Sequence, residues 1–207
     1  MANIKVSIAE NDLKTLKTNK YNLCLAFGER SMGFDVVCIG TDDYSSSNTF
    51  QVGNEYAVFF CKSVTDGETV DVSSEVQKIE LGQQITINKD SVFENPVEGK
   101  YSNRLEIVNN YGNVFPGFAR KVKYGADEGM RVAFVSSYVS MIGTFMMEPV
   151  NMVRIWFQQF AVTGTYFMDF IKEKEMSGRS AYVDALIDAS TKPDTVVLTY
   201  VNGKWKK

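Results

Sequence analysis

Histidine is absent from all 207 residues of the chain. Histidine is the commonest general base near neutral pH and a common transition-metal ligand, and every Ser-His-Asp triad needs it. Its absence excludes those catalytic arrangements. No glycine-rich phosphate loop, dinucleotide-binding motif or Gly-x-Ser-x-Gly elbow takes its place. We therefore expect no enzyme, no metal site and no cofactor.

Cysteine is scarce, and its spacing carries no motif. Cys24, Cys38 and Cys61 each lie inside an apolar run, and no two of them form a Cys-x-x-Cys pair. This pattern favours buried, reduced thiols in a cytoplasmic protein, ahead of one disulfide with a single free thiol.

Long apolar runs are also missing. Residues 132–147 and 155–168 are uncharged, but each stretch is interrupted by polar residues or glycine and is shorter than the roughly 20 apolar residues of a spanning helix. Residues 1–6 show no pattern of a classical secretion signal. We therefore expect no transmembrane helix and cytoplasmic synthesis, with later release left open.

No strongly basic surface is indicated. Lys and Arg number 22 against 25 Asp and Glu, which gives a net charge of −3. The basic residues are scattered, apart from 120–123 and the last four positions. Nucleic acid is therefore not an expected partner.

Alternation of apolar and polar residues with a period of two dominates the chain, and it predicts about a dozen short strands. The strand candidates are 4–8, 21–27, 34–39, 56–61, 69–72, 76–87, 105–108, 114–122, 131–139, 150–157, 165–171, 182–186 and 196–201. A helix is predicted only over 11–19. Residues 146–160 also fit helical spacing, but dense β-branched and aromatic residues after Pro149 favour a strand.

These elements predict an all-β fold, an antiparallel sandwich or barrel, and we favour an antiparallel β-sandwich with little helix. No repeat, low-complexity tract or clear linker divides the chain, so we expect a single domain over 1–207. A boundary near 91–103, where Asn95-Pro96 and Glu98-Gly99 mark turns, is the alternative.

The most unusual segment is 132–168, which carries only two charged side chains, Glu148 and Arg154, among many aromatic residues and methionines. It is either core or an apolar surface that contacts a partner, and core is favoured. Trp156 is predicted to be buried in either case. Residues 165–170 also alternate as a membrane-contacting strand would.

Aromatic residues outside that segment are the candidate ligand contacts, because aromatic rings pack against sugars and rest at lipid interfaces. The candidates are Tyr111, Phe115, Phe118, Tyr124 and Trp205. Ordinary core packing is the alternative for each of them.

Acidic residues offer weaker candidates. The loop 42–48 could hold a cation, but it lacks EF-hand spacing, which favours a solvated loop. Asp66, Glu68 and Asp71 fit a hairpin tip. A carboxylate pair for glycoside hydrolysis could come from carboxylates beside apolar runs. These are Glu106, Glu148, Asp169 and Asp184.

Several stretches together resemble a family of small uncharacterised β-rich proteins of fungi and bacteria. They are 21–26, 109–117, 148–150, 153–159 and 200–205. The resemblance implies a single β-rich domain, and it implies no activity, ligand or functional residue.

The leading functional hypothesis is a non-catalytic protein that recognises a glycan or a membrane surface, as lectin-like, toxin-like or defence proteins do. The alternative is a structural, self-assembling homo-oligomer in which the low-charge segment completes an interface. An enzyme that uses carboxylates or tyrosines ranks third.

Overall fold

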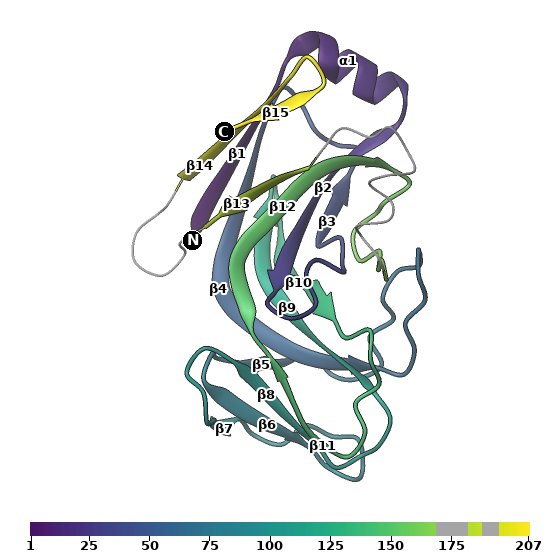
Figure 1. Cartoon of the computed structure of the whole chain (residues 1–207), viewed down its shortest axis with the longest axis vertical. Helices are drawn as coiled ribbons and strands as arrows, with labels where there is room; N and C mark the ends of the chain where they lie inside the picture. Colours follow the sequence, from purple (N-terminus) through teal and green to yellow (C-terminus); the bar gives the residue numbers. More distant parts are fainter. Residues whose placement is uncertain (169–181, 188–194) are drawn as a thin grey trace.

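The computed structural model describes residues 1–168, 182–187 and 195–207, and strands dominate it (Figure 1). The helix of these ranges is α1 (Glu10–Thr18), close to the predicted 11–19. The strands are β1 (Ala2–Ile8), β2 (Tyr21–Glu29), β3 (Ile39–Thr41), β4 (Ser47–Cys61), β5 (Gln77–Ile79), β6 (Gln83–Ile87), β7 (Val97–Glu98), β8 (Leu105–Asn109), β9 (Phe115–Tyr124), β10 (Asp127–Val135), β11 (Gly143–Met147), β12 (Pro149–Gln159), β13 (Val183–Leu186), β14 (Thr195–Val201) and β15 (Lys204–Lys206). The all-β prediction is confirmed.

The largest sheet has the order β10-β9-β4-β1-β14-β15, with β5 added to β4. The 15-residue β4 runs along much of the molecule in Figure 1. Its pairing with β9 shifts register between Val52 and Tyr56, which marks a β-bulge. β1 lies between β4, which is antiparallel to it, and β14, which is parallel to it.

Two four-stranded sheets complete the described fold. The second sheet has the order β13-β12-β2-β3 and faces the first, since Phe157 of β12 meets Tyr200 of β14 with ring centroids 4.9 Å apart. The third sheet, β11-β8-β6-β7, lies at the end away from α1 (Figure 1). Glu148 alone separates β11 from β12, so the chain passes directly from the third sheet to the second.

The main core draws buried side chains from all three sheets, including Ile4, Ile155 and Ile107. A second cluster forms on the opposite face of β2 and β12 around Trp156. β2 is therefore buried on both faces, which explains why its apolar run is continuous instead of alternating. The predictions that Trp156 is buried and that its segment is a strand are both confirmed.

Arg120 is an exception to the apolar core, because this arginine of β9 is fully buried. Its Nε donates to the carbonyl of Gly53 at 2.9 Å, and its guanidinium lies over the rings of Phe27 and Tyr56. The arginine thus satisfies a carbonyl that the bulge of β4 removes from the ladder. Burial lowers the pKa of Arg120 from its ordinary value.

Several local expectations have a clear outcome. All three cysteines are buried and none forms a disulfide, as predicted. Strands predicted over 34–39 and 69–72 are wrong for most of their length, because these segments make only a few bonds to 164–167. Of the predicted strand 165–171, residues 169–171 lie outside the described residues. Within the described ranges, no helix has the length and apolar character to cross a membrane.

The segment 91–103, the suggested alternative boundary, is built into the third sheet. It contains β7, which pairs with β6, and the backbone N–H groups of Lys100 and Tyr101 donate to Glu106. This integration leaves no extended linker at that position.

Candidate functional site

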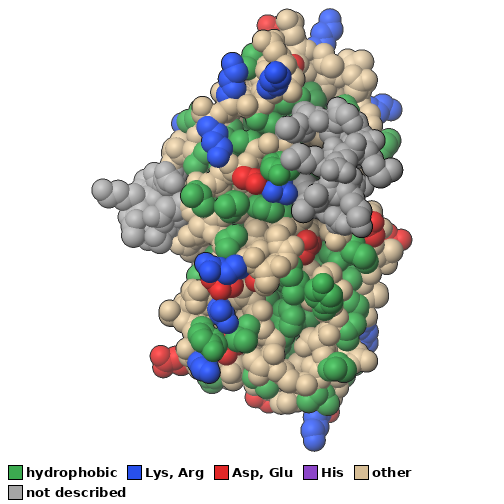
Figure 2. Space-filling view, in the orientation of Figure 1, with side chains coloured by type: hydrophobic (Ala, Val, Ile, Leu, Met, Phe, Trp, Pro, Cys, Tyr) green, Lys and Arg blue, Asp and Glu red, His purple; other side chains and the backbone are tan. Residues whose placement is uncertain are grey.

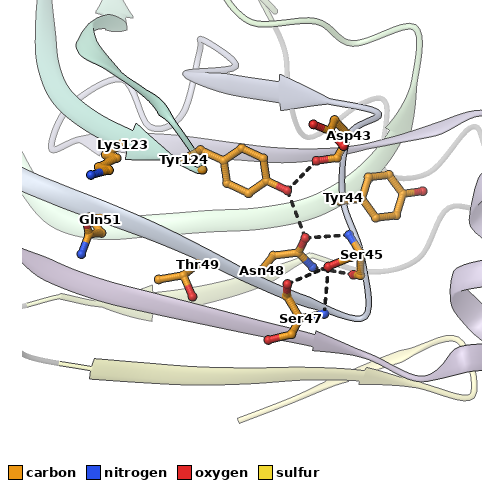
Figure 3. Close-up of a pocket in the computed structure, with 10 residues that line it drawn as sticks. Asp43, Tyr44, Ser45, Ser47, Asn48, Thr49, Gln51, Lys123 and Tyr124 are labelled. Carbon is orange, nitrogen blue, oxygen red and sulfur yellow. Dashed lines mark hydrogen bonds between the residues drawn. The ribbon is translucent and has the colours of Figure 1, made fainter.

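A polar hollow of about 420 Å³ lies between the loop that precedes β4 and the turn that follows β9 (Figure 3). Ten residues line it: Asp43, Tyr44, Ser45, Ser47, Asn48, Thr49, Gln51, Lys123, Tyr124 and Gly125. The hollow therefore belongs to one end of the first sheet, where β4 begins and β9 ends.

Asn48 holds the loop in place. Its side chain accepts a hydrogen bond from the N–H of Ser45 at 2.9 Å and donates to the carbonyls of Ser45 and Val6, at 2.7 and 3.3 Å. The side chain of Asn48 is nearly fully buried. The acidic loop is therefore fixed by its own amide, and among the described residues no group of three Asp, Glu or Cys side chains gathers to hold a metal ion.

Tyr124 forms one wall of the hollow. Its ring stacks on Phe50 with centroids 4.8 Å apart, and its hydroxyl lies 2.7 Å from the Asp43 carbonyl and 3.0 Å from Asn48 Oδ1. Burial, with a smaller effect of Asp43, raises the pKa of Tyr124 to about 12. The phenol therefore remains neutral at physiological pH and serves as a fixed wall, not as an acid or a base.

Three polar side chains of β4 form the open side of the hollow. Ser47, Thr49 and Gln51 occupy alternate positions and share the outward face, while the intervening residues point into the core. Lys123 lies opposite Gln51 on β9, and Figure 3 shows it beside Tyr124.

The same polar face continues across β1. Its outward positions Asn3, Lys5 and Ser7 stand opposite Gln51, Thr49 and Ser47 respectively. Gln51 Nε2 donates to Asn3 Oδ1 at 3.1 Å. Hydroxyl, amide and ammonium groups thus form a regular array on the outward face of the sheet, while the Tyr124 ring lies on the inward face with its register partner Phe50.

The hollow offers little for acid–base chemistry, since Asp43 is the only carboxylate among its lining residues. The carboxylates suggested for glycoside hydrolysis have structural partners elsewhere. Glu148 pairs with Arg30 at 2.7 Å and Arg104 at 3.3 Å, and both carboxylate oxygens of Asp184 accept bonds from Arg154 at 2.8 Å. Glu106 accepts the two backbone bonds described above, and Asp169 lies outside the described residues.

The five aromatic candidates do not meet at one site. Tyr124 alone lines the hollow. Phe118 is fully buried, Phe115 is half-buried, and Trp205 is partly buried and stacks on Phe157 at 5.3 Å against the main core. Tyr111 is partly exposed and stacks on Phe60, at the opposite end of β4 from Phe50.

Sequence reasoning missed the polar members of the site, Ser47, Thr49, Gln51 and Lys123. A signal was present, because Ser, Thr and Gln alternate with Asn48 and Phe50 immediately after the polar loop. Such alternation predicts a strand with a polar outer face, although it does not identify β9 as the neighbour.

None of the protein-family models, curated proteins and solved structures compared with this chain matches it.

Proposed function

We propose that this chain is a non-catalytic binding protein and that the hollow beside Tyr124 holds a glycan. The observation that carries the proposal is the array of Ser47, Thr49 and Gln51 on the outward face of β4, at the hollow that Tyr124 also lines. Sugar hydroxyls both donate and accept hydrogen bonds, and Ser, Thr and Gln side chains can do both in return.

The rigidity of the site also supports the proposal. The three polar side chains stand on a paired strand, and the bonds of Asn48 and the stacking of Tyr124 on Phe50 fix the adjoining loop and wall. A preorganised site loses little conformational entropy when it binds a ligand. In a flexible site a larger loss of entropy would weaken the binding of a polar ligand.

A glycan array followed by titration with the best-bound sugar tests the proposal. The double variant Ser47→Ala/Thr49→Ala removes two exposed hydroxyls, so we expect glycan affinity to fall about tenfold or more. Its melting temperature should stay within about 2 °C of the wild type, because exposed substitutions have small effects on stability. Thr144→Ala, an exposed threonine of β11 in the third sheet, is the matched control and should bind normally.

Two results would overturn the glycan assignment. One is an array on which no sugar binds above background. The other is glycan binding that the Ser47→Ala/Thr49→Ala variant leaves unchanged, which would place the sugar elsewhere on the molecule.

A further inference from the structure

Two neighbouring loops at the Phe60 end of β4 expose apolar side chains to solvent. One follows β8 and carries Tyr111, and the other joins β10 to β11 and carries Tyr138, Val139, Met141 and Ile142. Tyr138 is 69% exposed, and Met141 and Ile142 are each 72% exposed. We call these five side chains the apolar tip. Figure 2 shows hydrophobic side chains gathered over the lower half of the molecule, where Figure 1 places β8 and β11.

Buried hydrogen bonds hold the two loops together. The side chain of Asn109, which is fully buried, donates to the carbonyls of Ser140 and Met141 at 3.1 Å and accepts from the N–H of Tyr111 at 3.0 Å. The backbones of Val114 and Ser140 exchange two further bonds. The backbone of the apolar tip is therefore firmly held, so a poorly anchored loop does not explain the exposure of its apolar side chains.

Neither loop carries charge. Residues 107–119 and 132–147 contain no Asp, Glu, Lys or Arg. Soluble proteins rarely leave contiguous apolar side chains exposed without a partner, and such patches mark sites of protein or membrane contact.

We propose that the apolar tip inserts into the interfacial region of a lipid bilayer. The tip exposes on the order of 500 Å² of side chain, less than the roughly 800 Å² per partner of a stable protein interface. Side chains that are about 70% exposed project from the surface, and a fluid bilayer can enclose a projecting tip where a flat protein surface cannot. Tyrosine is also enriched at the level of lipid headgroups.

The absence of charged residues from the two loops indicates which kind of lipid the apolar tip should bind. No basic side chain in either loop is available to attract anionic headgroups, so neutral phosphatidylcholine should suffice and added salt should have little effect.

Insertion of the apolar tip into a membrane would leave the proposed glycan hollow accessible. Tyr111 of the tip stacks on Phe60, and Tyr124 of the hollow stacks on Phe50. Phe50 and Phe60 are ten positions apart on β4, roughly 30 Å along the strand.

Flotation with phosphatidylcholine vesicles tests the proposal on the whole chain. We expect the wild type to float with the vesicles and the double variant Met141→Ser/Ile142→Ser to lose at least tenfold in partitioning. The matched control, Phe160→Ser/Leu186→Ser, removes two apolar side chains outside the tip that are at least about as exposed, and it should bind as the wild type does. The tip variant should keep its glycan affinity, so this test stands or fails separately from the proposed function.

A fluorescent probe reports insertion directly. Because Cys24, Cys38 and Cys61 are buried, an Ile142→Cys variant can be labelled selectively with an environment-sensitive dye. Its emission should shift to the blue when neutral vesicles are added.

Three outcomes would overturn the proposal. They are failure to bind neutral vesicles, binding that the tip variant leaves unchanged, and a concentration-dependent dimer in light scattering that the tip variant abolishes. The last result would assign the tip to contact between two copies of the chain.

Discussion

Asp35 is a carboxyl group held in an unfavourable environment. It is only 8% exposed, and burial, followed by the negative charge of Glu29, raises its pKa from 3.8 to about 7. The carboxylate of Glu29 is held in place, because it accepts bonds from the N–H groups of Ser31, Met32 and Glu148. Burial raises the pKa of Tyr166 to about 12, and the nearby charge of Asp35 adds to that rise. Folding therefore favours the protonated form of Asp35.

This environment predicts that the Asp35→Asn substitution stabilises the protein more at neutral and alkaline pH than at pH 4. In the wild type, the stability that the protonated carboxyl group of Asp35 contributes is fully present below about pH 4 and is lost as the pH rises through 7. The reason is that the folded state holds this proton more tightly than the unfolded state does. A rise from 3.8 to about 7 corresponds to at most about 4 kcal/mol. Urea unfolding at pH 4, 6 and 8.5 should show a gain that grows with pH. An equal effect at all three values would contradict the prediction.

Trp156 is a second residue with a sharp expectation. Its ring is 4% exposed within the cluster around β2, and its Nε1 donates to Gln158 Oε1 at 2.8 Å. Trp156→Ala should lower the free energy of unfolding by about 3–5 kcal/mol, the usual cost of removing a large aromatic side chain from a core. Trp156→Phe keeps much of the packing and should cost less. Unchanged stability in the alanine variant, measured by denaturant titration, would show that the ring does not stabilise the fold.

At the scale of elements, α1 fixes the position of the β14–β15 hairpin. The carboxylate of Asp12 accepts bonds from the N–H groups of Asn202 and Gly203 at 2.7 and 3.1 Å. Both turn residues have positive φ, which suits Asn-Gly and matches the twist of a two-residue hairpin. Trp205 then folds back onto Phe157 and Tyr200.

Removal of that carboxylate should loosen the hairpin. We expect Asp12→Ala to cost about 1–2 kcal/mol, because two exposed bonds to a charged acceptor are lost. Asp12→Asn retains an acceptor and should cost about half as much. Melting curves give the stability, and hydrogen exchange at β15 should accelerate in the alanine variant. Unchanged exchange there would mean that Trp205 and its ring contacts hold the hairpin without help from α1.

Elements were easier to predict than their partners. Apolar patterning identified β1, β2, β9, β12 and β14, because alternation, or in β2 a continuous apolar run, reports local burial. It missed the parallel pairing of β1 with β14 and of β6 with β8, because register between distant strands depends on the whole chain. For the same reason the sequence suggested Tyr124 as a ligand contact but could not separate it from the buried Phe118.

At the scale of the whole molecule, the low-charge segment 132–168 proved to have two roles. Its strand β12 supplies buried side chains such as Ile155 and Phe157, as expected for core. The loop before β11 exposes Tyr138, Met141 and Ile142 instead. Both parts are apolar and poor in charge, so only the position of each residue relative to the sheets distinguishes core from surface.

The parallel pairing of β1 with β14 has a consequence for biosynthesis. Ile4 pairs with Val196, so about 190 residues must be translated after β1 before its second neighbour exists. At roughly 5–20 residues per second, the ribosome needs on the order of 10–40 s for that stretch. Throughout this interval one edge of β1 has no strand to pair with, and an open edge invites pairing with other nascent chains. The first sheet can therefore be completed only after β14 has been translated, and β1 needs protection from such pairing most before that moment.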